Sequence, residues 1–178
     1  MRHLIGAMIL GATVLSGTAL AGGNFTLDGK NTKIEFTGTK PGGKHVGGFT
    51  NLTGTAAGAD AASLKLEVEI DTTSLFTDTP KLTNHLKSAD FFEVKTYPKA
   101  KFVSTKIEKA ADGYTVTGDL TLHGKTKSIS FPAGIKVGAD AVSLNSTFKI
   151  NRQDFGISFG AGKVDDDVTL KVTVNAKK

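Results

Sequence analysis

The sequence predicts an all-β protein whose strands form an antiparallel barrel. Three observations support this fold class: apolar and polar residues alternate with a period of two along most of the chain, short turn sequences separate the alternating rows, and only one segment breaks the rhythm. An alternating row is typical of a strand with one apolar face and one face in water. Because a long sheet with a single apolar face must curl to cover that face, we expect eight or nine strands in an up-and-down barrel, with a two-sheet sandwich as the alternative.

Residues 1–21 have the features of a cleaved signal peptide. Arg2 and His3 begin it, an uncharged apolar run follows over residues 4–20, and Ala19-Leu20-Ala21 supplies the small-x-small pattern that signal peptidase cleaves. A membrane anchor is the alternative, but several Gly, Ser and Thr residues make this run less apolar than the roughly 20-residue helix that spans a bilayer. We therefore expect export and a mature domain of residues 22–178, long enough for a single core.

The composition argues against several classes of function. The chain has no Cys, which removes disulfides, thiol catalysis and cysteine metal sites. Its 22 Lys and Arg exceed its 17 Asp and Glu, but the positive charge is mostly scattered lysine and the chain has no Trp. Nucleic-acid binders usually cluster their basic residues beside aromatic stacking partners. We expect no nucleic-acid partner, no transmembrane segment after processing, and only transient contact with anionic membranes.

The alternating rows place most of the strands. They cover residues 33–36, 64–70, 114–122, 129–137, 142–150 and 168–174, and a further strand begins at Lys101. The turn sequences Asp112-Gly113, His123-Gly124 and Gly138-Ala139-Asp140 lie between the later rows. From about residue 100 onward the connections are too short for parallel neighbours, which need crossovers of about a dozen residues or more. This part of the chain is therefore expected to be an antiparallel meander.

Residues 79–92 interrupt the strands and predict a short helical insert. Thr79 suits the N-cap position, Pro80 suits the first helical position, and Leu82 and Leu86 lie one turn apart. Two phenylalanines, Phe91 and Phe92, follow directly. We expect this insert to cover one mouth of the barrel as a lid.

The polar residues form no recognisable catalytic or metal-binding motif. His45, His85 and His123 lie far apart in the sequence, without the close spacing of a zinc site, and no G-x-S-x-G motif occurs. We expect no metal, no cofactor and no catalysis. Arg152 lies beside Asp154 at the end of a predicted strand, and we expect it to form an ion pair that fixes the following turn rather than to contact a ligand.

Three motifs resemble the YceI-like family. They are NHLKSADFFEVKTYP at residues 84–98, GDLTLHGKTK at residues 118–127 and INRQDFGI at residues 150–157, and the similarity extends over residues 24–176. The resemblance implies an extended, eight-stranded, lipocalin-like barrel whose central pocket holds a polyisoprenoid or a similar amphiphile, such as an isoprenoid quinone. It also implies a periplasmic location and a homodimer. Residues 38–49 are richer in Gly than in many members, so the ligand is expected to differ if this stretch forms part of the pocket wall.

The leading prediction is therefore a periplasmic protein that binds, transports or stores a long-chain amphiphilic lipid. Each methylene moved from water into an apolar pocket contributes about 0.8 kcal/mol. We expect the ligand to contact inward strand positions and the lid, with His45 and His85 at the mouth: Phe36, His45, Phe49, Leu66, Val68, Phe76, Leu82, His85, Leu86, Phe91, Phe92, Leu122, Phe131 and Phe148.

Two other functions stay open at this point. An eight-stranded barrel is just wide enough either to hold a slim ligand or to be filled by its own side chains. A filled barrel would be a non-catalytic interaction or stress-response module. An enzyme acting on a bound lipid, with His45, His85 or His123 as the acid–base group, ranks last.

Overall fold

The computed structural model describes residues 22–178, so the expected signal peptide lies outside the described residues. Eleven strands form one antiparallel sheet, accompanied by one α-helix, α1 (Pro80–Lys87), and two 3-10 turns, η1 (Thr72–Ser74) and η2 (Arg152–Phe155). The strands are β1 (Gly23–Asp28), β2 (Thr32–Lys40), β3 (Gly43–Phe49), β4 (Leu52–Gly58), β5 (Lys65–Asp71), β6 (Leu75–Thr77), β7 (Lys99–Ala110), β8 (Gly113–Leu122), β9 (Lys125–Val137), β10 (Ala141–Asn151) and β11 (Asp167–Lys177).

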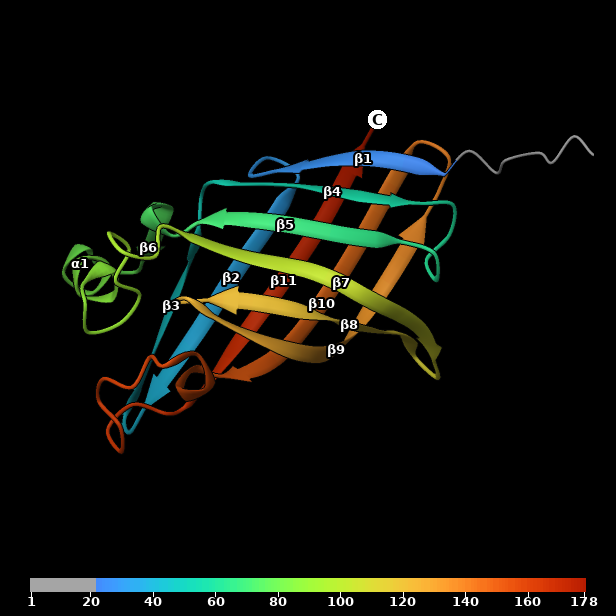
Figure 1. Ribbon diagram of the computed structural model, residues 1–178. Coiled ribbons are helices and arrows are strands. Elements are labelled where there is room, and N and C mark those ends of the chain that lie inside the picture. The colour runs from blue at the N-terminus through green and yellow to red at the C-terminus, as the bar shows by residue number, and fades with distance from the viewer. Residues whose placement is uncertain (1–21) are drawn as a thin grey trace, which may run out of the picture.

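The sheet curls into two halves that face each other across the interior (Figure 1). The strand order is β1-β4-β5-β7-β8-β9-β10-β11-β2-β3-β6. Strand β9 belongs to both halves, because residues 125–133 pair with β8 and residues 134–137 pair with β10. The chain also passes between the halves at four links: β1 to β2, β3 to β4, β5 to β6 and, through α1, β6 to β7. The apolar faces of both halves are thereby turned inward.

The predicted all-β antiparallel class is confirmed, but the count of eight strands is wrong. The strands that the alternating rows did not place are β1, β3, β4 and β6, none longer than seven residues. Strand β3 is rich in Gly, and β4 is rich in Gly, Ala and Thr, so both lack the clear apolar–polar alternation by which a strand is predicted from sequence. The two edge strands, β1 and β6, are not paired with each other in the described chain, so the structure is a curled half-barrel rather than a sheet closed by hydrogen bonds.

The predicted helix is confirmed, although it is shorter than the whole insert. The hydroxyl of Thr79 accepts a hydrogen bond from the amide of Leu82 at 3.3 Å, and Pro80 occupies the first turn, where its missing N–H is not needed. The helix ends at Lys87, and residues 88–97 continue as turns. It lies beside β6 at one end of the curled sheet (Figure 1). Within residues 22–178, no helix combines the length and apolar character that crossing a membrane requires.

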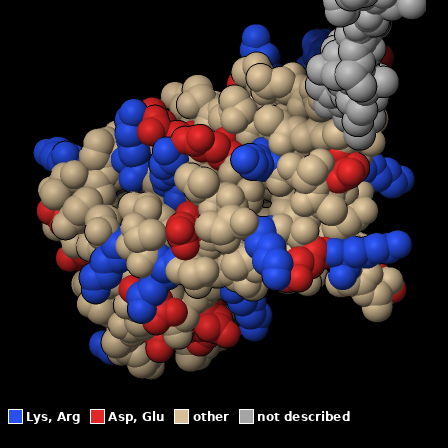
Figure 2. Space-filling view, turned by 45° about the vertical axis from the view of Figure 1, so that its right-hand side comes forward, with Lys and Arg blue, Asp and Glu red and all other residues tan. Residues whose placement is uncertain are grey.

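The surface carries charges of both signs. Figure 2 shows basic and acidic side chains interspersed over one face of the molecule. Two of the ion pairs join β5 to β7, with Lys99 2.6 Å from Glu69 and Lys101 2.5 Å from Glu67. Such exposed pairs contribute about 0–1 kcal/mol each, so the fold depends mainly on the interior.

The interior contains two apolar clusters at different depths. One cluster, which we call the packed cluster, fills the part of the interior that is remote from α1, and Phe25, Leu27 and Val116 are almost completely buried within it. The other, which we call the cavity cluster, lies toward α1 and includes Ile70, Leu122 and Phe155. Side chains thus fill one part of the curled sheet, and the other part surrounds a hollow.

Candidate ligand-binding cavity

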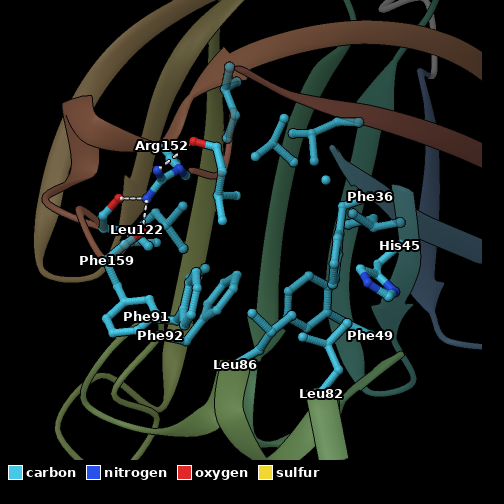
Figure 3. Close-up of a pocket in the computed structure, with 18 of the residues that line it drawn as sticks. Phe36, His45, Phe49, Leu82, Leu86, Phe91, Phe92, Leu122, Arg152 and Phe159 are labelled. Atoms are coloured by element: carbon cyan, nitrogen blue, oxygen red, sulfur yellow. Dashed lines mark hydrogen bonds between the residues drawn. The ribbon is translucent and has the colours of Figure 1, made fainter. Parts of the chain in front are cut away.

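A cavity of about 340 Å³ opens beside α1, between the two halves of the sheet (Figure 3). Its walls come from strands, the helix and two loops, and most of the side chains are apolar. The lining residues are Ile34, Phe36, Gly38, Thr39, Lys40, His45, Phe49, Ile70, Leu82, His85, Leu86, Phe91, Phe92, Ala100, Leu120, Leu122, Ile150, Arg152, Ile157, Phe159, Val164, Val168 and Leu170.

The side walls are the inward positions at the ends of the long strands. Ile34 and Phe36 project from β2, Leu120 and Leu122 from β8, and Leu170 from β11. Successive inward residues of a strand are two positions apart, so each strand contributes side chains to the same face. This period-two pattern is the reason why the wall is apolar on every side.

The helix and the turn after it form the lid. Leu82 and Leu86 point from α1 into the cavity, with Phe91 and Phe92 beside them (Figure 3). The amide of Phe92 donates to the carbonyl of Leu86 at 2.9 Å, which folds the turn back onto the helix. No residue of α1 is buried, because the apolar side of the helix faces a hollow instead of a packed core.

The Gly-rich stretch does form part of the wall. Gly38 and His45 line the cavity, and Phe49 packs between Phe36 and Phe92, with ring centroids 6.0 and 5.9 Å away. At Gly47 a Cβ atom would lie 2.4 Å from Cζ of Phe36. The absence of a side chain at Gly47 therefore allows the Phe36 ring to lie directly against β3.

Arg152 holds the loop that forms the remaining wall. Its side chain is 5% exposed, and Nη1 donates to the carbonyls of Ile157 and Phe159 at 2.8 Å each. Nε and Nη2 donate to the carbonyls of Asp165 and Val164, both at 3.1 Å, and Nη2 also lies 3.2 Å from the carboxylate of Asp166. All five guanidinium hydrogens are used. The structural role predicted for Arg152 is confirmed, with Asp166 rather than Asp154 as the carboxylate.

Two histidines lie at the mouth of the cavity, each beside a carboxylate. His45 Nδ1 is 3.0 Å from Asp78 Oδ2, and His85 Nε2 is 3.0 Å from Asp90 Oδ2. The His85 ring also stands edge-on to Phe159, with centroids 5.0 Å apart. Both imidazoles are partly exposed to solvent. We use "mouth" for this opening, which His45, His85 and Phe159 border.

The third histidine, His123, lies outside the cavity lining. Its Nδ1 is 3.2 Å from the carbonyl oxygen of Phe155, and its Nε2 is 3.8 Å from Glu93. The Tyr97 ring packs against the imidazole at a centroid distance of 4.5 Å. The three histidines are thus separate from one another, and within residues 22–178 no three His, Asp or Glu side chains form a group that could hold a metal ion.

The cavity brings together many, but not all, of the expected contact residues. Those that line it are Phe36, His45, Phe49, Leu82, His85, Leu86, Phe91, Phe92 and Leu122. Leu66 and Phe131 belong to the packed cluster instead, and Val68 and Phe148 pack against that cluster. Phe76 lies on the outer surface and is 46% exposed. For the nine expected residues that line the cavity, contact with a ligand stays a prediction.

Several lining residues are absent from the set expected from the sequence, for two different reasons. Ile34, Leu120 and Leu170 share the inward phase of their strands and could have been included on that basis. Ile157 and Phe159 come from the loop after η2, where no periodicity indicates the direction of a side chain. In the described chain no carboxylate lines the cavity, and its charged or titratable lining groups are Lys40, His45, His85 and Arg152. The arrangement suits an apolar molecule whose polar end remains at the mouth.

Comparisons with known proteins agree on one family. The YceI-like domain matches residues 25–176. A UPF0312 protein of Pseudomonas putida (strain W619) is 33% identical in an alignment over 193 residues, which covers 100% of this chain and 98% of that protein. BcnA of Burkholderia cenocepacia has a similar crystal structure, with a TM-score of 0.75, 25% identity, and coverage of 82% of this chain and 96% of BcnA.

A second solved structure shows the same fold at lower identity. It is a polyisoprenoid binding domain from Saccharophagus degradans, which is implicated in plant cell wall breakdown. The TM-score is 0.68 at 16% identity, over 86% of this chain and 97% of that domain. This likeness concerns the fold alone.

Proposed function

The chain belongs to the YceI-like family, and on that premise we propose that it binds the apolar chain of an amphiphilic lipid in the cavity beneath α1. The lipid is polyisoprenoid-like, and the protein transports or stores it without transforming it. The observation that carries the proposal is the cavity itself, a hollow of about 340 Å³ whose lining is almost entirely apolar.

The energetics of such a site need no catalytic group. Burial of apolar surface contributes about 25 cal/mol per Å², so a lipid tail is held by the area it removes from water. Pockets for small ligands are typically apolar with few polar groups, which orient the ligand. Here Lys40, His45 and His85 are the polar side chains placed to meet a head group at the mouth. The polyisoprenoid-binding domain of the same fold adds support for this class of ligand.

We place the mature protein in the periplasm, on the basis of the signal-peptide features in residues 1–21. A carrier between membranes needs no anchor of its own, and its ligand enters and leaves through an opening such as the mouth. The homodimer that the family resemblance implies stays a prediction.

The filled-barrel alternative is favoured by one observation, the packed cluster. Phe25, Leu27 and Val116 show that half of the interior is closed. The other part of the interior is hollow, however, and α1 covers it with leucines that face the hollow and are not buried in a core. An interaction module would not require this combination of an apolar hollow and a half-buried lid.

The proposal is tested by native mass spectrometry of the mature protein, combined with extraction of the same sample into organic solvent. We expect a discrete added mass that solvent releases and that is identified as a lipid with an apolar chain. An unliganded mass, together with an unchanged melting temperature after addition of isoprenoid alcohols or fatty acids, would contradict lipid binding and favour the interaction module.

A further inference from the structure

We infer that three neighbouring phenylalanine rings close the base of the cavity and limit the length of lipid chain that the interior accepts. We call these three rings, Phe102, Phe131 and Phe148, the floor. The inference rests on the proposed lipid binding and makes it more specific, because it assigns the selection of chain length to named residues.

In the half of the sheet that contains β5 and β7, the cavity ends at the same depth along both strands. On β5, Ile70 lines the cavity, whereas Val68, the next inward residue, does not. On β7, Ala100 lines the cavity and Phe102 does not. Val68 and Phe102 are register partners, and both pack against the cavity cluster and the packed cluster. The boundary between hollow and core therefore crosses both strands side by side.

In the half of the sheet that contains β10 and β11, the cavity gives way to packed side chains at a corresponding depth. On β10, Ile150 lines the cavity, whereas Phe148 packs against the packed cluster. On β11, Leu170 lines the cavity, whereas Val172 packs against the packed cluster. Phe148 is the register partner of Leu170, so the floor begins directly beside the last lining residue of β11.

The three rings connect the two halves across the interior. Phe102 comes from β7 in one half, Phe148 from β10 in the other, and Phe131 from β9, the strand that belongs to both. Phe131 and Phe148 are stacked, with centroids 4.2 Å apart and planes at 7°, and Phe102 lies 5.6 Å from Phe131. Aromatic pairs at such distances attract each other beyond the effect of their buried area.

A glycine keeps the first ring in place. A Cβ atom at Gly118 would lie 2.5 Å from Cζ of Phe102 and 2.5 Å from the carbonyl oxygen of Val103. The ring of Phe102 therefore lies across β8 at the one inward position of that strand without a side chain. Beyond the floor, Val116 is completely buried in the packed cluster. A lipid chain that reaches the floor can go deeper only if these rings move.

The consequence is a limit on useful chain length. A cavity of about 340 Å³ lies near the lower end of the range of about 300–1,000 Å³ for small-molecule pockets. Each methylene that enters the cavity is expected to raise affinity about fourfold. Once the lipid chain reaches the floor, its further carbons stay at the mouth, where they remain in water and add little to the affinity. Affinity should rise with chain length and then reach a plateau.

The test is a series of isoprenoid alcohols of increasing length: geraniol, farnesol, geranylgeraniol and solanesol. Each is measured by competition against the fluorescent fatty acid parinaric acid, using the mature protein. For the unmodified chain we expect affinity to rise along the shorter alcohols and to level off before solanesol. For Phe148→Ala we expect the plateau to move to a longer alcohol, with a gain of about 15-fold for the first alcohol beyond the original plateau, equivalent to roughly two more buried methylenes.

Two further variants keep the result interpretable. Phe148→Leu retains an apolar side chain and is expected to shift the plateau less than Phe148→Ala, and it serves if the alanine variant fails to fold. Phe76→Ala removes a phenylalanine from the outer surface, 46% exposed, and should leave the whole profile unchanged. Melting temperatures establish that each variant is folded.

The outcomes separate this inference from the proposed function. An affinity that keeps rising up to solanesol in the unmodified protein, or a plateau that Phe148→Ala and Phe148→Leu leave in place, overturns the floor and leaves lipid binding intact. If none of the alcohols nor parinaric acid binds, lipid binding fails and the floor fails with it.

Discussion

Nη2 of Arg152 lies 3.2 Å from Oδ1 of Asp166, and this ion pair is one bond in a set of five that anchors the loop beside the cavity. The other four bonds go to backbone carbonyls, those of Ile157 and Phe159 among them. Because Ile157 and Phe159 line the cavity, the buried guanidinium of Arg152 fixes the position of the loop that forms this wall.

Arg152→Ala should lower the free energy of unfolding by about 3 kcal/mol or more, because each buried acceptor left without a donor costs about 1–3 kcal/mol. Asp166→Asn should cost about 1 kcal/mol or less, since that carboxylate is half exposed and supplies only one of the five bonds. Urea unfolding of both variants measures the difference. Equal losses would show that the ion pair, and not the set of carbonyls, dominates.

Phe159→Ala should weaken lipid binding, because Phe159 lines the cavity while 45% of it is exposed to solvent. Phe76→Ala is the matched control, since Phe76 is 46% exposed but lies outside the cavity. Loss of one aromatic contact should reduce affinity about tenfold, equivalent to roughly 1.4 kcal/mol. Competition against parinaric acid provides the measurement. The proposed site is in doubt if the two variants bind alike.

Gly47→Ala should destabilise the fold by about 1–3 kcal/mol, because its Cβ would clash with the Phe36 ring and with the carbonyl of Phe76, at 2.4 and 2.5 Å. Gly38 is the control in the adjacent strand: a Cβ there meets nothing within 4 Å, and Gly38→Ala should change stability by less than about 0.5 kcal/mol. Thermal unfolding of the two variants compares them. Comparable stability of both would show that Phe36 can move away from β3.

Acid should destabilise the protein partly through Asp71. The hydroxyl of Thr73 donates to this carboxylate at 2.6 Å and, with further donors including the Thr73 amide, lowers the pKa of Asp71 below its usual range. A lowered folded-state pKa contributes stability above the unfolded value of about 3.9, which is lost as pH falls through the folded value. Unfolding free energies of the unmodified chain and Asp71→Asn, measured from neutral pH down to the acid range, should converge as the pH falls. Parallel curves would contradict this contribution.

Export should remove residues 1–21, because Ala19 and Ala21 are the small residues that signal peptidase accepts. Intact-mass analysis of the protein from a periplasmic fraction should give a chain that begins at Gly22. Replacing Ala21 with a bulky residue should block processing and keep the precursor at the membrane. An unprocessed chain in the cytoplasm would contradict the periplasmic location.

Much of the site could be predicted because it follows from local rules. Period-two alternation identified the inward direction of Phe36 and Leu122, and both line the cavity. The capping residue Thr79 and the first-turn Pro80 identified the helix, which places Leu82 and Leu86 over the hollow. These features depend on backbone geometry within a few residues, so the amino-acid order alone determines them.

Only the tertiary structure decided how deep the hollow extends. Phe131 and Phe148 point inward by the same alternation as Leu122, yet they form the floor, because the alternation gives a side chain's direction but not its depth or what faces it from the opposite half of the sheet. The loop residues Ile157 and Phe159 were likewise beyond prediction, since Arg152 positions them through carbonyls distant from any periodic pattern. Sequence determined which faces are apolar, and the crossing of the two halves determined where those faces meet and where they leave a cavity.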